Sequence, residues 1–347
     1  MTVPLQQILD TLRVVSLPMA TRFRGVDTRE VALLRGPEGW AEFSPFLEYP
    51  DTEAATWLAA AIDFAFVPQP AALRNTIGVN ATAPAVAPEA VPAVLARFGA
   101  CRTAKVKVAE AGQVLADDIA RVHAVRDALG PEGRIRVDAN GAWNLDEAER
   151  AVHALAEFDL EYVEQPCATL DELVELRRRI RYLDIPIAAD ESVRKSADPG
   201  LVARAGAADI LVIKVQPLGG IRAALNIVAT ARMPAVVSSA LESSVGLAMG
   251  IALAAALPQP EGTDAARYDG TPYDGTPYDF DSGLGTAALL AADVCSPALL
   301  PNAGQLPVTR PNPDPALLDT HAASPERTTW WQDRIRRCYP LLRAQTR

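Results

Sequence analysis

Short apolar runs recur along the middle of the chain, and the stretches between them carry apolar residues at helical spacing. The runs predict seven strands, at residues 76–82, 104–108, 134–139, 160–165, 185–190, 209–215 and 235–240. An eighth strand is expected near residues 278–285. Strands that alternate with helices in this way predict a parallel α/β barrel of the TIM type, whose chemistry lies at the carboxyl ends of its strands.

Both ends of the chain lack this alternation. Residues 29–35 and 40–46 are predicted to be antiparallel strands, and residues 51–66 a helix. The predicted organisation is therefore an α+β module over residues 1–73, a barrel over 74–295, and a proline-rich segment over 296–347 that returns to the first module.

A five-residue unit repeats in tandem within residues 268–280, YDGTPYDGTPYDF. Its glycine, proline and aspartate content is typical of turns. We interpret it as a flexible insertion without a function, at the end of the barrel opposite the chemistry.

Three acidic residues end consecutive predicted strands: Asp138, Glu164 and Asp190, which are 26 residues apart in each step. We expect their side chains to converge at the mouth of the barrel, where they would repel one another unless a cation neutralised them. Oxygen ligands with no histidine or thiolate nearby indicate a hard ion, Mg²⁺ first and Mn²⁺ second. Glu191 is expected to alternate away from the mouth, which makes it a weaker ligand candidate.

Lysines lie on the strands before and after these carboxylates. Lys105 and Lys107 share one face of their strand, so both are expected to point into the barrel, where an unused charge would be costly. The alternative, an edge strand with two solvated lysines, is disfavoured because the opposite face is apolar.

Lysine normally titrates near 10.4, too high for a base at neutral pH. Lys105, a divalent ion and burial would all favour the neutral amine of Lys107, which could then act as a base. Lys214 on the later strand would face the other side of a substrate, as a second acid/base group or as an ammonium over a planar intermediate.

The loop SSALESSVG, residues 238–246, ends a predicted strand and begins an apolar helix. Free backbone N–H groups at a helix N-terminus attract a carboxylate, and the hydroxyls of Ser238 and Ser239 would add donors. Simple capping of the helix by Ser243 or Ser244 is the alternative.

Composition narrows the classes of partner. The 347 residues carry 43 acidic and 33 basic side chains, a net charge of -10 without a basic block, which argues against nucleic acid. The N-terminal residues do not resemble a signal peptide, and the apolar run 245–257 is too short to span a bilayer. Scattered cysteines suit reduced thiols in the cytoplasm. A small carboxylate is the expected partner.

The motifs K-x-K, VDAN, VEQP, ADES and K-x-x-x-x-GG, in this order and spacing, resemble the enolase superfamily and its muconate-lactonizing-enzyme-like subgroup. The resemblance implies a modified (β/α)7β barrel under an α+β capping domain built from both chain ends. It also implies a site with the metal ligands Asp138, Glu164 and Asp190, the catalytic lysines Lys107 and Lys214, and Lys105 as an assisting group.

Within the superfamily, SSALESSVG, KVQPLGG, GLGTAALLAADV and RFRG (residues 22–25) are most similar to the o-succinylbenzoate synthase family of menaquinone biosynthesis. That resemblance implies syn-elimination of water from 2-succinyl-6-hydroxy-2,4-cyclohexadiene-1-carboxylate. Lys107 would remove the proton and return it to the departing hydroxyl, and Lys214 would stabilise the enediolate by a cation–π contact.

The same resemblance assigns residues to the substrate. Asn140 would support its metal-bound end, and Ser238 and Ser239 would receive its succinyl carboxylate. Two cap loops, residues 19–25 and 45–50, would close the site, with Arg22 or Arg24 facing the substrate.

Two alternatives stay open. An N-acylamino acid racemase or dipeptide epimerase of the same superfamily also uses two lysines on opposite faces, but a loop with glycine and methionine is expected there in place of Ser-Ser-Ala-Leu-Glu. A non-catalytic barrel would be expected to lack a ligand or a lysine, and here all are present. The sequence does not determine the oligomeric state.

Overall fold

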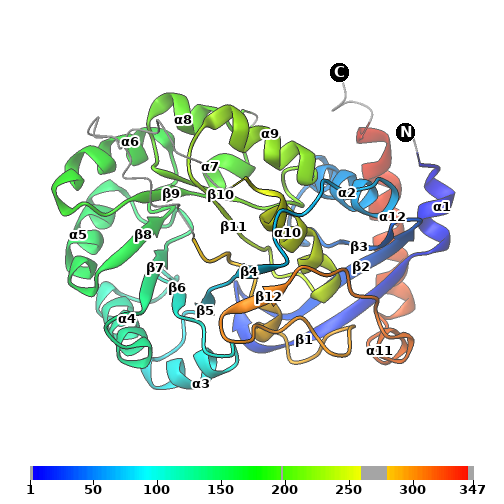
Figure 1. Ribbon diagram of the computed structural model, residues 1–347, viewed down its shortest axis with the longest axis horizontal. Coiled ribbons are helices and arrows are strands. Elements are labelled where there is room, and N and C mark those ends of the chain that lie inside the picture. Colours follow the sequence, from blue (N-terminus) through cyan, green and yellow to red (C-terminus); the bar gives the residue numbers. More distant parts are fainter. Residues whose placement is uncertain (1–2, 197, 259–279, 343–347) are drawn as a thin grey trace.

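Seven parallel strands form a curled sheet at the centre of the computed structural model, which describes residues 3–196, 198–258 and 280–342. The strands lie side by side in chain order, which is the arrangement of a barrel (Figure 1). They are β5 (Ala81–Ala83), β6 (Thr103–Lys107), β7 (Arg134–Asp138), β8 (Leu160–Glu164), β9 (Ile187–Ala189), β10 (Ile210–Ile213) and β11 (Ala235–Val237).

The register of the central strands fixes which residues meet at the mouth. Lys107 pairs with Asp138 across β6 and β7, and Asp138 pairs with Glu164 across β7 and β8. Because side chains alternate along a strand, a slip of one residue would turn all of these groups away from the barrel interior.

The gap between the first and last strands is closed by a very short segment. Ser282 bridges to Val79 and Gly283 to Ser238, both in parallel. The predicted eighth strand is therefore reduced, among its described residues 280–285, to two bridges. Gly283 is needed for this close approach, since a Cβ there would lie 2.6 Å from the Ser238 Oγ. The tandem repeat, apart from Phe280, lies outside the described residues.

Helices cover the outside of the barrel. They are α3 (Val91–Ala96), α4 (Leu115–Leu129), α5 (Leu145–Leu155), α6 (Leu170–Arg179), α7 (Glu191–Arg194), α8 (Leu201–Ala205), α9 (Ile221–Ala231) and α10 (Ser244–Ala256), with 3₁₀ turns at Pro88–Ala90, Ala156–Phe158, Arg181–Leu183 and Thr286–Leu289. Capping boxes begin two of them: Asn144 and Glu147 start α5, and Thr169 and Glu172 start α6.

Helix α10 is buried on nearly every side between the barrel and the cap, as its uniformly apolar sequence predicts. In the described part of the chain, no helix combines the length and apolar character needed to cross a membrane.

The predicted strand 76–82 is two strands. Residues Thr76–Gly78 form β4, which pairs antiparallel with β12 (Gln305–Pro307), while β5 pairs parallel with β6. The single-strand prediction was wrong because the partner of β4 lies more than 200 residues further along the chain, where local sequence gives no sign of the pairing.

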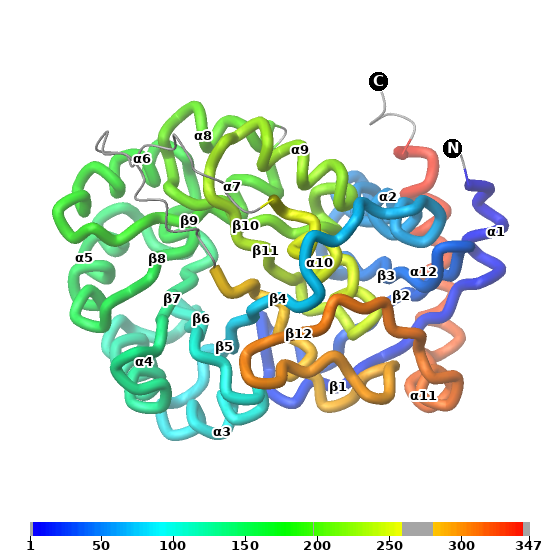
Figure 2. Tube along the Cα trace, viewed as in Figure 1, coloured from blue at the N-terminus to red at the C-terminus, as the bar shows by residue number. Residues whose placement is uncertain are grey.

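The cap combines both ends of the chain, as expected. Its antiparallel sheet has the order β1 (Arg13–Phe23), β2 (Val26–Gly36) and β3 (Gly39–Phe43). Helices α1 (Leu5–Asp10), α2 (Asp51–Phe66), α11 (Pro315–Thr320) and α12 (Pro325–Leu341) complete it. Strand β1 was not predicted; the helix at 51–66 was. Figure 2 shows α12, near the C-terminus, running beside α2 and α1.

The domain boundaries at residues 73/74 and 295/296 stay predictions.

Trp331 joins the two ends of the chain. Its indole is fully buried, donates a 2.8 Å hydrogen bond to Glu30 of β2 and meets the Phe43 ring edge-to-face at 5.6 Å. Arg327, one turn earlier in α12, pairs with the same Glu30 oxygen at 2.7 Å.

Trp331→Ala is expected to lower the free energy of unfolding by about 3–5 kcal/mol, the usual cost of truncating a buried aromatic side chain. Trp330→Ala, at the partly buried neighbour, should cost only about 1 kcal/mol. Urea unfolding of both variants measures the difference. Equal losses would show that α12 does not hold the cap through Trp331.

Candidate active site

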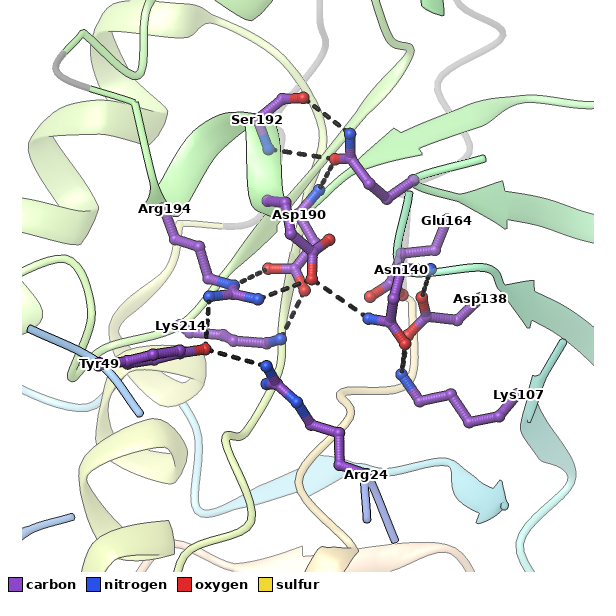
Figure 3. Close-up of polar contacts among 12 residues, drawn as sticks. Arg24, Tyr49, Lys107, Asp138, Asn140, Glu164, Asp190, Ser192, Arg194 and Lys214 are labelled. Carbon is purple, nitrogen blue, oxygen red and sulfur yellow. Dashed lines mark hydrogen bonds and ion pairs between the residues drawn. The ribbon is translucent and has the colours of Figure 1, made fainter. Parts of the chain in front are cut away.

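The predicted chemical groups come together at the mouth of the barrel. Lys105 and Lys107 lie on β6, Asp138 and Glu164 end β7 and β8, and Asp190 and Lys214 directly follow β9 and β10. Figure 3 shows Lys107 and Lys214 reaching the carboxylates from opposite sides. The chain has only four lysines among its 33 basic residues, and three of them are here.

Lys105 lies between two carboxylates. Its Nζ is 3.0 Å from Glu164 Oε1 and 3.1 Å from Asp138 Oδ2, and all three side chains are nearly inaccessible to solvent. Burial acts to lower the pKa of Lys105, but Glu164 and Asp138 outweigh it and hold that pKa well above its usual range. The two carboxylates therefore favour the ammonium form of Lys105.

The pKa of Lys107 is shifted in the opposite direction from that of Lys105. Its Nζ donates to Asp138 Oδ2 at 2.5 Å and to Asn140 Oδ1 at 2.6 Å. Burial lowers the pKa of Lys107 below its usual range, and the neighbouring Lys105 adds to this against the attraction of Asp138. Of the two lysines on β6, Lys107 is the one that more readily gives up its proton.

The carboxylates differ as well. Burial would raise the pKa of Asp138, but Lys107 and Lys105 outweigh it and keep this pKa below its usual range. Burial raises the pKa of Glu164 to about 7, and the charges of Asp138 and Asp190 contribute to the rise. The carboxylates therefore interact with one another, and Glu164 lacks enough positive charge nearby to offset its burial.

Asp190 has two cationic partners. Lys214 Nζ approaches its Oδ2 at 2.6 Å, and Arg194 Nε approaches its Oδ1 at 2.9 Å. These two cations overcome the effect of burial and lower the pKa of Asp190. Arg194 was not predicted. The signal that could have found it is its position four residues after Asp190, since that spacing brings the two side chains together in the single turn of α7.

Gln165 is a second residue that the sequence analysis missed. Its Oε1 accepts the backbone N–H groups of Asp190 (3.0 Å) and Ser192 (3.2 Å), and its Nε2 donates to Cys167 O at 2.8 Å. The fully buried Gln165 side chain thereby fixes the backbone that carries Asp190.

The expectation that Glu191 turns away from the mouth was wrong. Its Oε1 accepts from Asn140 Nδ2 at 3.2 Å and from Arg194 Nη2 at 2.6 Å. Strand alternation does not apply, because the strand ends at Ala189 and helix α7 begins at Glu191. Asn140, with φ of 49°, folds back so that its backbone N–H donates to Asp138 at 3.0 Å.

A pocket lies between these groups and the cap. Its lining includes every predicted lysine and substrate-binding residue, namely Lys105, Lys107, Lys214, Asn140, Ser238, Ser239 and Arg24, together with Arg194, Tyr49, Phe23, Phe46 and Trp57. Asp138, Glu164 and Asp190 are not part of the lining, because the lysine ammonium groups lie against them. The pocket thus combines cationic and aromatic walls.

The cap side of the pocket centres on Tyr49. Its hydroxyl accepts from Arg24 Nη2 and from Arg194 Nη1, each at 3.2 Å, so it connects a cap loop to the barrel. Arg24 also stacks on the Phe46 ring at 4.3 Å. Of the two arginines considered for this loop, Arg24 lines the pocket, while Arg22 is exposed and pairs with Asp27.

Two backbone N–H groups at the N-terminus of α10 are already bonded to acids. The Ser243 N–H donates to Glu42 at 3.1 Å, and the Ser244 N–H to Asp293 at 3.0 Å. Neither serine caps the helix with its side chain, since both hydroxyls donate to the same two acids. Ser239 Oγ donates to Gly283 O at 2.8 Å.

Among the described residues, no three acidic, histidine or cysteine side chains form a ready-made metal cluster. Lysine ammonium groups stand between the carboxylates instead. The donor set nevertheless fits a hard divalent cation: three fully buried carboxylates lie close together, and the nearby Glu191 Oε2 is buried without a hydrogen-bond partner.

Two family models match the chain along most of its length. The Enolase N-terminal domain-like model covers residues 14–65, and the Enolase C-terminal domain-like model covers residues 87–296. Together with the barrel, the cap and the lysine–carboxylate mouth, they define a protein of the enolase superfamily.

Curated relatives narrow this class. The o-succinylbenzoate synthase of Mycobacterium ulcerans (strain Agy99) is 54% identical over 339 residues, 97% of this chain and 96% of the relative. That of Mycobacterium tuberculosis (strain ATCC 25618 / H37Rv) is 53% identical over 340 residues, 98% and 97% of the two chains. The chain belongs to the o-succinylbenzoate synthase family.

Solved structures share the fold at low identity. A muconate lactonizing enzyme from Pseudomonas fluorescens, complexed with muconolactone, has a TM-score of 0.73 at 20% identity, covering 90% of this chain and 98% of the other. The L-Ala-D/L-Glu epimerase from Bacillus subtilis has a TM-score of 0.67 at 21% identity, covering 87% and 96%. The fold therefore does not separate the synthase from the epimerases.

Proposed function

We propose that this chain is an o-succinylbenzoate synthase, which removes water from 2-succinyl-6-hydroxy-2,4-cyclohexadiene-1-carboxylate to give o-succinylbenzoate in menaquinone biosynthesis. The observation that carries the proposal is the placement of Lys107 and Lys214 on opposite sides of a buried carboxylate group, inside a pocket with cationic walls. The identity of 53–54% to curated synthases supports the choice of reaction.

Lys107 is the proposed acid/base group. Its lowered pKa favours the neutral amine, which takes the proton from the ring carbon that bears the carboxylate. The ammonium so formed returns that proton to the hydroxyl on the adjacent carbon. Proton and hydroxide leave from the same face as one water molecule, and the ring becomes aromatic.

Lys214 is proposed to act from the other face. As an ammonium held by Asp190, it would lie over the planar, delocalised intermediate and stabilise it by a cation–π contact. Lys105 keeps its proton and holds Asp138 and Glu164 in place, which is an assisting role.

Asp138, Glu164 and Asp190 are the proposed ligands of Mg²⁺, with Mn²⁺ as a substitute. A bound divalent cation would supply positive charge that favours enediolate formation next to the substrate carboxylate. Asn140 would support this end of the substrate through its contacts with Lys107 and Glu191.

The succinyl carboxylate is proposed to bind at the other end of the pocket. Ser238 offers a hydroxyl there, and Arg24 offers a cation from the cap. Ser239 would exchange its hydrogen bond to Gly283 O for one to the carboxylate. The N-terminus of α10 is not assigned to this carboxylate, because the Ser243 and Ser244 N–H groups are bonded to acids.

We place the protein in the cytoplasm. The thiols of Cys101, Cys167, Cys295 and Cys338 are all buried and unpaired, as in a reducing compartment. The acidic net charge of -10 supports a small-molecule partner in preference to nucleic acid.

The function is tested by following the diene absorbance of the substrate with Mg²⁺ and then with excess EDTA. We expect loss of absorbance only with the metal. If folded protein leaves the substrate unchanged in both conditions but exchanges the α-proton of N-succinyl amino acids into deuterium oxide, the racemase alternative replaces this proposal.

Lys107→Ala should reduce turnover at least ~10³-fold, because it removes the group that moves the proton. The matched control is Lys195→Ala, at the one lysine outside the pocket, which should keep most of the activity. Steady-state kinetics with thermal unfolding separates lost chemistry from lost folding. Substantial turnover by the Lys107 variant would assign the base elsewhere.

Asp190→Asn should weaken Mg²⁺ binding by at least the roughly 10- to 100-fold that loss of a group supporting a ligand costs, since it removes the charge of a ligand itself. Asp184→Asn makes the same substitution in an exposed turn and should leave metal affinity unchanged. Titration calorimetry with Mg²⁺ measures both. Unchanged affinity and metal dependence in the Asp190 variant would refute the ligand assignment.

A further inference from the structure

A second group of buried charges lies between the cap and the barrel, outside the proposed mechanism. It consists of Arg29 on β2, Glu42 on β3 and Glu242 in the loop before α10. Their exposed fractions are 2%, 0% and 3%. Charges this deeply buried are costly unless they are paired and hydrogen-bonded, so their contacts are informative.

Arg29 contacts both walls of the pocket. On the barrel side, its Nε donates to Leu241 O at 3.0 Å and its Nη2 to Ala240 O at 3.4 Å. On the cap side, Nη2 donates to Ser44 O, and the guanidinium lies 4.5 Å from the centre of the Phe46 ring. Ala240, Leu241 and Phe46 all line the pocket.

The two glutamates bind the donors of the same loop. Glu242 accepts the Ala240 N–H at 2.6 Å and the Gln216 Nε2 at 3.2 Å. Glu42 accepts the Ser243 N–H at 3.1 Å and, from the cap, the Ser44 hydroxyl at 2.6 Å. Backbone donors and acceptors of residues 240–243 are thus held by three buried ionisable side chains, one of them from the loop itself.

The backbone of this loop needs such support. Leu241 has φ of +66°, a left-handed conformation that a residue with a branched side chain adopts only when its surroundings impose it. Its carbonyl is the acceptor of the Arg29 Nε. Arg29 therefore bonds to the loop at Leu241, the residue with the unfavourable left-handed backbone conformation.

Gly246 provides the space for the acids. A Cβ at this position would lie 2.6 Å from Glu242 Cβ and 2.7 Å from Glu42 Cδ. This glycine is in the first turn of α10, where alanine would otherwise favour the helix. The glycine in SSALESSVG is explained by the packing of the two carboxylates against the helix.

We propose that Arg29 is a positioning residue, which, with Glu42 and Glu242, aligns the loop 238–243 with the cap residues Ser44 and Phe46 and so sets the width of the pocket at its succinyl end. The inference rests on the proposed function, because it assigns that end of the pocket to the second carboxylate of the substrate. The planar guanidinium reaches three carbonyl groups in fixed directions, which a lysine ammonium does not reproduce.

The test compares Arg29→Lys with Arg35→Lys. Arg35 lies on the same strand but is exposed and stacks only loosely on Trp40, at 5.9 Å. Arg29→Lys is expected to raise KM about tenfold while kcat changes less than about threefold, because a misaligned pocket weakens substrate binding more than it slows the chemical step. The same variant should speed amide hydrogen exchange in residues 238–246. Arg35→Lys should change neither KM nor exchange.

Gly246→Ala is the second variant, since it keeps all three ionisable side chains but forces the two acids to move. It should reproduce the rise in KM and the faster exchange, even if Arg29→Lys does not fold. Exchange at wild-type rates in both variants would overturn the proposal, as would faster exchange with an unchanged KM. Hydrogen exchange needs no substrate, so it also tests the role of Arg29 if the wild-type protein shows no synthase activity.

Discussion

Neutralisation of buried charge is the constraint on which the rest of this structure depends. Asp138, Glu164 and Asp190 have no exposed surface, and each is stabilised by a lysine or arginine at hydrogen-bonding distance. The contacts require that neighbouring strands keep their register, that the barrel closes, and that a cap excludes water from the mouth. Loss of the strand register, of barrel closure or of the cap would separate these charges from their partners or expose them to water.

The cap is held together, and joined to the barrel around the pocket, by similar contacts of charged side chains. Its sheet comes from the start of the chain and its longest helix from the end, and Glu30 joins them through Arg327 and Trp331. Charged groups join the cap to the barrel where Arg24 and Arg194 share the Tyr49 hydroxyl and around Arg29. A further ion pair joins Arg222 of α9 to Asp63 of α2. The same fold occurs in lactonizing enzymes and epimerases, so the fold alone does not set the substrate.

Local sequence was sufficient to predict the strands and helices whose apolar residues recur at a regular spacing. The strands bearing Lys105, Asp138 and Glu164 were predicted because alternation decides which side of a strand faces the barrel. Helices α2 and α10 followed from their apolar pattern. The pairing of β4 with β12 was not predicted, and the predicted eighth strand is reduced to the bridges of Ser282 and Gly283 with Val79 and Ser238. Neither segment is long enough to show a period, and each is held by a partner far away in the chain.

The sequence by itself determined the chemical groups of the candidate site and their order around the barrel, because strand spacing and side-chain parity are local properties. Only the tertiary structure decided how those groups are partnered. It placed Arg194 and Gln165 on Asp190, turned Glu191 toward Asn140 where a strand gives way to a helix, and bonded the first N–H groups of α10 to Glu42 and Asp293. Apart from the Arg194–Asp190 pair within α7, these contacts join segments up to about 200 residues apart, and they form only when the complete fold brings their backbones together.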